Sequence, residues 1–167
     1  MATSKRDQEV TLEGVRIVFR NFAGVEKKFN EEGKRNFAVV LDEEYADAME
    51  EKGWVVKRKP PREEGEEPFN FIPVTVSFKG NPPQLVMISS RGRTTLDQET
   101  AELLDYAEID SVDVILRPYD WEVNGNRGRK AYLKKIYVII HEDELDLKYA
   151  GVEEVGQHLD PGPDEFE

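Results

Sequence analysis

The residues best suited to chemistry lie in two runs rich in β-formers that flank Asn124-Gly125, a pair typical of tight hairpin turns. Alternation places a mixed aromatic and cationic set on one face of each run: Arg117, Tyr119 and Trp121 in the first, and Lys130, Tyr132 and Lys134 in the second. Rings that stack on bases, beside cations that contact phosphates, are how proteins hold single-stranded nucleic acid. In the alternative interpretation, Trp121 and the tyrosines pack in the core and the cations face water.

Further cations and aromatic residues recur along the chain and are predicted to contribute to the same binding surface. They are Lys27, Lys28, Lys34, Arg35, Lys57, Arg58, Lys59, Phe69, Phe71, Lys79, Arg91, Arg93, Arg127 and Arg129. A basic cluster alone is also typical of an ordinary solvated surface, and the interspersed glutamates weaken each cluster. Phe69 and Phe71 could equally be covered by the neighbouring loop or a short helix, and Phe22 and Phe29 are open to the same two interpretations.

Catalytic chemistry has few candidates in this sequence. The chain has no cysteine, and its two histidines, His141 and His158, lie in or beside an acidic C-terminal stretch. A nuclease-like metal site would need Asp105, Asp110 and Asp113, which lack the spacing of a recognised metal loop. We therefore expect a binding protein rather than an enzyme, with no cofactor and no metal.

The formal net charge of −12 argues at first against a polyanionic ligand. Residues 1–140 hold 22 basic and 25 acidic residues, whereas 141–167 hold 1 basic and 10 acidic residues, so most of the imbalance belongs to the tail. The chain finishes with an acidic segment around one aromatic residue, and we predict a partner-binding site at Asp164, Glu165, Phe166 and Glu167. A tail of this kind can also be a solubilising appendage, or lie in the protein's own cationic groove.

Short apolar runs separated by Gly, Pro and Asn predict the elements that position these residues. Strands are expected over residues 10–22, 35–42, 54–59, 69–79, 84–90, 112–123 and 129–140. Asp42 is expected to cap a short helix with Tyr45, Ala48 and Met49 on its apolar face. A second helix over 95–107 is indicated by the Thr95 and Gln98 spacing of a capping box.

This order of elements predicts an all-β or β-rich fold: an OB-like five-stranded antiparallel barrel with one or two short helices and extra hairpin strands. Residues 1–145 would form this domain and 146–167 a flexible acidic tail. OB barrels bind oligonucleotides through one face and two loops, which would here be residues 23–34 and 124–128. No stretch is long and apolar enough to cross a bilayer or to resemble a secretion signal, so we expect a cytoplasmic location and no membrane partner.

Three segments carry a resemblance to a known family: GKRNF at 33–37, RPYDWEVNGNRGRKAYLKKIYV at 117–138, and the terminal acidic segment with its Phe. With the β-rich order, they resemble bacteriophage single-stranded DNA-binding proteins. The resemblance implies an OB fold that coats single-stranded DNA in replication, recombination or repair, inside the bacterial host cell. It also implies a tail that contacts replication proteins such as polymerase or helicase. Glu167 follows Phe166 here, whereas the common tail ends on the aromatic residue.

Other functions remain open at this point. An acidic interaction module or DNA-mimic inhibitor would fit the net charge and would present an acidic barrel face. Double-stranded DNA or RNA binding is less well supported, because no recognition helix with base-reading side chains is evident. The sequence does not decide between a monomer and a homodimer.

Overall fold

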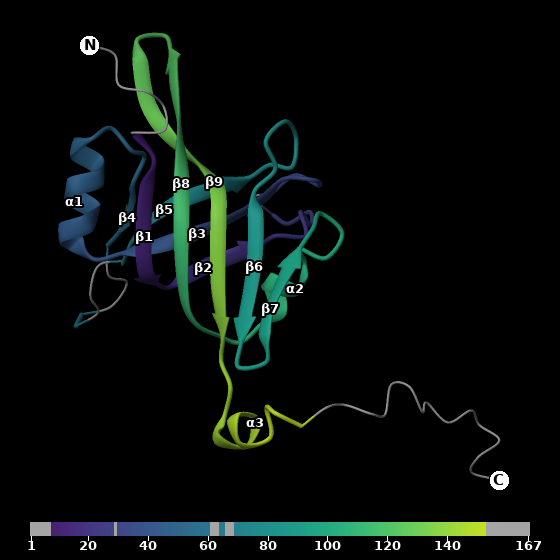
Figure 1. Ribbon diagram of the computed structural model, residues 1–167. Coiled ribbons are helices and arrows are strands. Elements are labelled where there is room, and N and C mark those ends of the chain that lie inside the picture. Colours follow the sequence, from purple (N-terminus) through teal and green to yellow (C-terminus); the bar gives the residue numbers. More distant parts are fainter. Residues whose placement is uncertain (1–7, 29, 61–63, 66–68, 153–167) are drawn as a thin grey trace.

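The protein is described from a computed structural model that covers residues 8–28, 30–60, 64–65 and 69–152 (Figure 1). Its strands are β1 (Val10–Val15), β2 (Ile17–Asn21), β3 (Arg35–Leu41), β4 (Lys57–Lys59), β5 (Phe69–Val76), β6 (Gln84–Ser89), β7 (Gly92–Leu96), β8 (Ile109–Val123) and β9 (Asn126–Ile140). Its helices are α1 (Glu43–Glu51), α2 (Leu103–Tyr106) and α3 (Glu144–Lys148). No helix in the described part of the chain is long and apolar enough to span a membrane.

The barrel closes through a bend in its first strand. The predicted strand over 10–22 is split at Arg16 into β1, which pairs with β8, and β2, which pairs with β3. Gly14, at φ +62°, lies where the β1–β8 register shifts, as in a bulge that re-aims a strand. The Val40 amide donates to the Arg16 carbonyl at 2.9 Å across the bend. The two halves of this bent strand, β1 and β2, are therefore the first and last members of the order β1-β8-β9-β5-β3-β2, so the bend closes the sheet into a barrel.

The pairing confirms the OB-like barrel with one correction. Most neighbours are antiparallel, but β5 pairs with β9 in parallel, as does β6. The expected all-antiparallel barrel is therefore wrong at these two pairs. The chain runs from β5 through β6, β7, α2 and β8 before β9 returns beside β5, and such a long connection permits a parallel neighbour.

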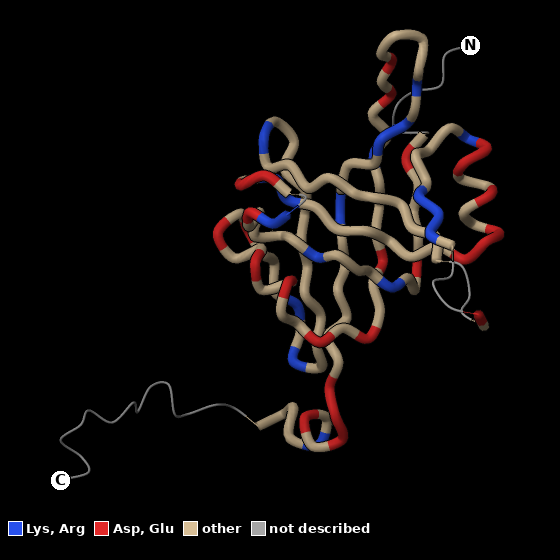
Figure 2. The backbone as a smooth tube through the Cα atoms, turned by 180° about the vertical axis from the view of Figure 1, so that it is seen from behind, with Lys and Arg blue, Asp and Glu red and all other residues tan. Residues whose placement is uncertain are grey.

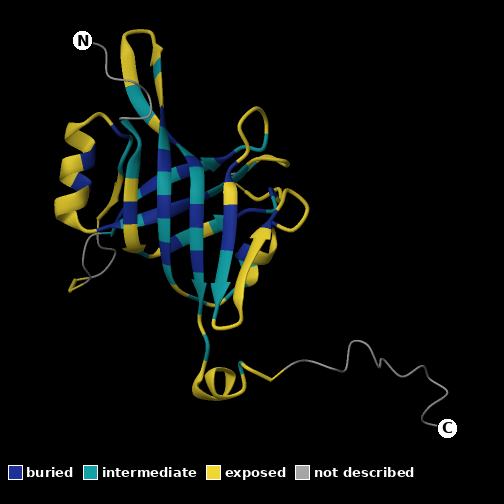
Figure 3. Ribbon diagram, viewed as in Figure 1, coloured by how far each residue is buried: buried dark blue, intermediate teal, exposed yellow. Residues whose placement is uncertain are grey.

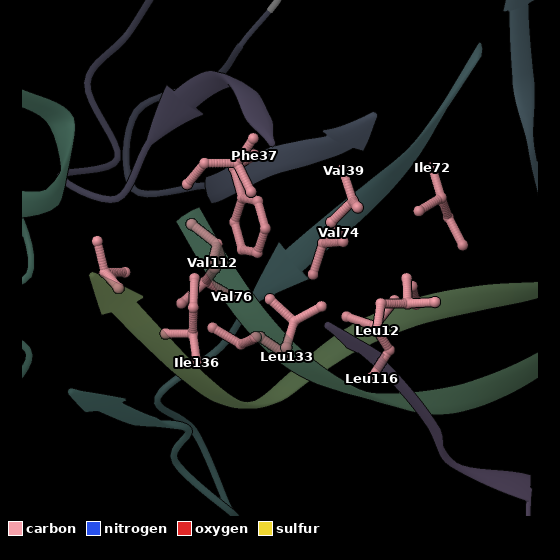
Figure 4. Close-up of a cluster of buried hydrophobic side chains, with 14 of the residues drawn as sticks. Leu12, Phe37, Val39, Ile72, Val74, Val76, Val112, Leu116, Leu133 and Ile136 are labelled. Atoms are coloured by element: carbon pink, nitrogen blue, oxygen red, sulfur yellow. The ribbon is translucent and has the colours of Figure 1, made fainter. Parts of the chain in front are cut away.

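The core lies inside the barrel and follows from strict alternation. Along β5, Asn70, Ile72, Val74 and Val76 are buried while the residues between them are half-exposed, as the sequence predicts for the three apolar side chains. Side chains such as Phe37, Leu116 and Ile136 meet these from the other strands (Figure 4). The long strands β8 and β9 show the same banding of buried and half-buried residues (Figure 3). The outer face of β5 is therefore left for other contacts.

Helix α1 begins as predicted, because the Asp42 carboxylate accepts from the Tyr45 amide at 2.8 Å. Its buried residues are Ala46 and Met49, so the expected apolar face is wrong at Tyr45 and Ala48, which are exposed. The strand predicted over 54–59 is shorter, because only 57–59 pair with β5.

The helix predicted over 95–107 is wrong in its first half. Thr95 lies in β7, opposite Val86 of β6, and only Leu103–Tyr106 is helical. The turn between them starts at Asp97, whose carboxylate accepts from the amides of Glu99 and Thr100, both at 2.9 Å. This carboxylate, rather than a Thr95 cap, binds the backbone amides that precede α2.

Helix α2 is fixed to the barrel by two side chains. The Asp105 carboxylate accepts from the backbone amides of Phe22 at 2.7 Å and Ala23 at 3.0 Å. In return, the Arg20 guanidinium donates to the carbonyls of Leu104 and Ala107, both at 2.8 Å. These bonds hold the start of the 23–34 loop against α2.

Helix α3 follows β9 and carries a capping box between Asp143 and Asp146. It lies apart from the barrel and has no buried residue (Figures 1 and 3). The predicted boundary between residues 145 and 146 falls within this helix.

Replacing Asp105 by Ala should lower the free energy of unfolding by about 1–3 kcal/mol, because two part-buried amides lose their acceptor. Urea denaturation followed by circular dichroism measures the change. Glu122→Ala, which removes an exposed carboxylate from β8, is the matched control and should change stability little. Equal stability of the Asp105→Ala variant and the wild type would contradict this role.

Candidate nucleic-acid interface

Residues from four segments of the chain line an open groove of about 470 Å³ on the outside of the barrel. We call it the tyrosine groove, and its lining residues are Gly33, Lys34, Arg35, Asn36, Thr75, Val76, Ser77, Phe78, Lys79, Gln98, Lys130 and Tyr132. The fold thus brings together five of the predicted contacts, Lys34, Arg35, Lys79, Lys130 and Tyr132. Among these described lining residues none is acidic.

Tyr132 and Phe78 line the groove, and Tyr119 lies in ring contact with Tyr132. The rings of Tyr119 and Tyr132 lie 5.6 Å apart between centroids, and 56% of Tyr119 is exposed. Tyr119 is paired with Lys130 across the β8–β9 hairpin, and Tyr132 is paired with Thr75 across the parallel β5–β9 contact. The Lys130 ammonium lies 5.6 Å from the centroid of the Tyr132 ring. Strand pairing therefore fixes two accessible rings beside a cation.

The groove cations differ in what they already bind. The Arg35 guanidinium donates to the carbonyls of Phe22 at 2.6 Å and Gln98 at 3.1 Å, and it lies 5.1 Å from the centre of the Phe78 ring. Arg35 thereby anchors the 23–34 loop. Lys34 contacts Glu31 at 3.2 Å, but both side chains are largely exposed, so this ion pair is weak.

Two further predicted cations are paired with one carboxylate. Lys134 contacts Glu9 at 2.8 Å, and the Arg117 guanidinium approaches the same carboxylate at 4.0 Å. The Glu9 side chain is only 14% exposed, so this contact is shielded from water better than the pair in the loop. The two cations therefore share one negative charge in this structure.

Trp121 and Arg129 make contacts that support the hairpin. Trp121 is half-buried and packs so closely on Gly128 that an added Cβ there would lie 3.0 Å from its ring. Arg129 binds Asp120 at 2.8 Å and lies over the ring of Trp54, which is buried. For Trp121, these contacts favour the packing interpretation that the sequence left open.

A second aromatic and cationic cluster lies on β4 and β5. Lys57 is paired with Phe71 and Lys59 with Phe69, so these four side chains share the outer face. Arg58 points to the opposite side, where it binds Asp47 at 2.6 Å and Glu50 at 3.4 Å on α1. Figure 2 shows the basic strand β4 beside this acidic helix.

Phe19 joins this cluster, although strict alternation within β2 would place it on the same side as the buried Ile17. Its ring centroid lies 5.4 Å from that of Phe71 and 6.2 Å from that of Phe69, and 57% of the residue is exposed. The β2–β3 register shifts between Val18 and Asn21, which reverses the expected side. No sequence signal marks this shift.

The other predicted contacts lie outside the tyrosine groove. Lys27 and Lys28 belong to a turn closed by mutual backbone bonds between Lys27 and Asn30, while Arg91, Arg93 and Arg127 lie at hairpin turns. Phe22 is buried and stacks on Phe37 at 5.0 Å, so it packs in the core. The predictions for Phe29 and for the tail residues Asp164, Glu165, Phe166 and Glu167 fall outside the described residues.

Comparison with known protein families identifies the family of this chain. The family model "Putative phage ssDNA-binding domain" matches residues 1–164. The chain belongs to this phage single-stranded DNA-binding family. A search of curated proteins by sequence finds no significant match. Membership supports single-stranded DNA binding and bears out the resemblance seen in the sequence.

Solved structures similar to this family member come from bacteriophage Enc34. Its single-stranded DNA-binding protein in complex with ssDNA aligns with a TM-score of 0.56 and 11% identity, over 86% of this chain and 95% of that one. A C-terminal truncation of the same protein aligns with a TM-score of 0.52 and 10% identity, over the same shares of the two chains. At these identities the likeness shows a shared fold.

The three aspartates considered for a metal site in this phage family member bind separate partners. Asp105 accepts from two backbone amides of the β2 end, Asp113 accepts from the Gly14 amide at 2.8 Å, and Asp110 contacts His141 Nδ1 at 2.7 Å. In the part of the chain that the structure describes, no group of three or more His, Cys, Asp or Glu residues could hold a metal ion.

The Asp110 contact has a measurable consequence for His141. Its hydrogen bond to the carboxylate, and then the carboxylate's charge, raise the pKa of His141 above the ordinary value of 6.5. NMR titration should therefore show His141 with a higher pKa in the wild type than in the Asp110→Asn variant. The pair stabilises the fold below the ordinary pKa, and this stabilisation is lost as the pH rises through the raised value. An unchanged pKa in the variant would contradict the assignment.

Proposed function

We propose that this protein binds single-stranded DNA in the tyrosine groove with little sequence preference. Tyr119 and Tyr132 would stack on bases, while Lys34, Lys79 and Lys130 would contact phosphates. The observation that carries this proposal is the groove itself, in which the half-buried Tyr132, in ring contact with the exposed Tyr119, adjoins lysines from three separate segments. Among the described lining residues none is acidic.

The geometry favours an unpaired strand over a duplex. Ring stacking requires access to the face of a base, and the bases of a duplex already stack on one another. The competing DNA-mimic function requires an acidic barrel face, whereas the described lining of this groove is cationic. The overall negative charge is compatible with binding, because most of it belongs to residues 141–167 rather than to the barrel.

Replacing Tyr132 by Ala should weaken single-stranded DNA binding by about fivefold or more, because one stacked base contributes on the order of 1–3 kcal/mol. Fluorescence anisotropy with labelled oligo-dT measures the affinity. Tyr106→Ala is the matched control, because Tyr106 is 80% exposed on α2 and does not line the groove.

The same titration with a matched duplex and with single-stranded RNA tests the class of ligand. Single-stranded DNA affinity should fall steeply as salt rises, because lysines displace counterions from phosphates. Equal losses for Tyr132→Ala and Tyr106→Ala, or tighter binding of the duplex, would contradict the proposal.

We further propose that the protein coats single-stranded DNA during phage DNA replication, recombination or repair in the host cytoplasm, and that residues 146–167 recruit polymerase or helicase. Family membership supports the DNA-binding part of this role. The placement of α3 away from the barrel supports a separate tail, because Leu145, Leu147 and Tyr149 are all more than half exposed there. A short acidic and apolar segment of this kind suits a basic docking groove on a partner.

Ending the chain after Leu145 should abolish binding to the replicative polymerase or helicase while leaving the tyrosine groove intact, because it removes the whole of residues 146–167. Isothermal titration with each purified host protein measures recruitment, and Phe166→Ala in the full chain tests the aromatic contribution. DNA affinity should rise slightly in the shortened chain, because acidic charge is removed. Unchanged recruitment by the shortened chain would remove the tail proposal.

A further inference from the structure

A patch of three phenylalanine rings lies on the outer face of the barrel and has no role in the core. Phe19, Phe69 and Phe71 contact one another with ring centroids 5.4 to 6.2 Å apart, and we call them the phenylalanine platform. Phe69 and Phe71 are half-buried, while Phe19 is 57% exposed. Contiguous apolar surface that stays open to water marks a contact site more often than isolated exposed residues do.

The backbone at Phe19 is strained in a way that keeps its ring outside. Its φ is +53°, a region that bulky residues rarely adopt. Such conformations persist where the surroundings impose them, and they cluster at functional sites. Asn or Gly would occupy this conformation more easily, so backbone preference does not explain the presence of Phe at this position.

Cations flank the platform in the arrangement that a nucleic-acid strand requires. Lys57 and Lys59 share its face through their pairing with Phe71 and Phe69. The Lys59 ammonium lies 5.3 Å from the centroid of the Phe19 ring. A base stacked on this ring would place its phosphate within reach of these lysines.

The platform and the tyrosine groove lie on the same side of the barrel. Phe69, Phe71 and Thr75 alternate with the buried residues of β5, and Thr75 is paired with Tyr132. Phe69 and Thr75 are six positions apart, which corresponds to about 20 Å at 3.3 Å per residue. One extended strand of DNA can therefore cross the face from one aromatic site to the other.

We propose that the phenylalanine platform is a second base-stacking site, occupied by the same DNA strand that fills the tyrosine groove, and that Phe19 is its principal residue. The inference rests on the proposed function. Once a strand is held in the groove, its contact with the platform becomes intramolecular, so the platform strengthens binding only for strands long enough to reach both sites.

Anisotropy titrations of the full chain with labelled oligo-dT of about 4 and about 16 nucleotides test this, since OB sites span that range. The key variant is Phe19→Gly, because glycine takes a positive φ without strain, which offsets part of the loss of the ring contacts and keeps the variant folded. We expect its affinity for the long strand to fall about tenfold, while affinity for the short strand, which can occupy either site, falls at most about twofold. Phe19→Tyr should retain wild-type affinity.

The outcomes separate this inference from the function on which it rests. Unchanged long-strand affinity of Phe19→Gly, with weakened binding by Tyr132→Ala, would overturn the platform and leave the groove in place. Equal losses of long-strand and short-strand affinity in Phe19→Gly would also overturn it, because the ring would then support the fold rather than one stacking site. Failure of the wild type to bind either strand would overturn both proposals.

Discussion

The bend between β1 and β2 is the constraint on which the rest of the structure depends. By pairing with β8 before Arg16 and with β3 after it, a single strand closes the sheet on itself. Closure gives each strand of the barrel one buried side and one outer side. With the inner side filled by aliphatic residues and Phe37, the outer sides of β5 and β9 are available for Thr75 and Tyr132 to meet. A sheet that stayed open would not fix this neighbour relation.

Acidic and basic side chains are concentrated in different parts of this protein. Two of the α1 carboxylates, Asp47 and Glu50, bind Arg58, and Glu9 is shared by Lys134 and Arg117. The main acidic excess belongs to residues 141–167. The tyrosine groove is lined by lysines, and none of its described lining residues is acidic. An acidic protein can thus present a local cationic surface, because interactions between exposed charges fade over roughly 10 Å at ordinary salt.

Local patterns predicted much of this arrangement. The alternation of Ile72, Val74 and Val76, the Asn124-Gly125 hairpin and the Asp42 cap all appear in the structure. What sequence could not supply depends on contacts between distant residues. Arg35, which the sequence predicts to contact DNA, also anchors a loop through the carbonyls of Phe22 and Gln98, and no local pattern indicates this second role. The register shift that exposes Phe19 likewise depends on how β2 meets β3 rather than on any local pattern.

The helix predicted over 95–107 fails for a related reason. Thr95 and Gln98 have the spacing of a capping box, but pairing of β7 with β6 takes Thr95 into a strand. Asp97 then binds the amides of the following turn. Pairing between β6 and β7 outweighs the helix preference of this segment, because tertiary contacts commonly override helix propensity.

Photocross-linking is the most direct test of the central claim that single-stranded DNA lies in the tyrosine groove. An oligo-dT carrying 5-iododeoxyuridine, which joins covalently to aromatic rings it stacks upon, would be irradiated with the full chain and the adducts mapped by mass spectrometry. The account predicts adducts at Tyr132 and Tyr119. Adducts confined to residues remote from the groove, such as Tyr45 on α1 or Tyr106 on α2, would contradict it.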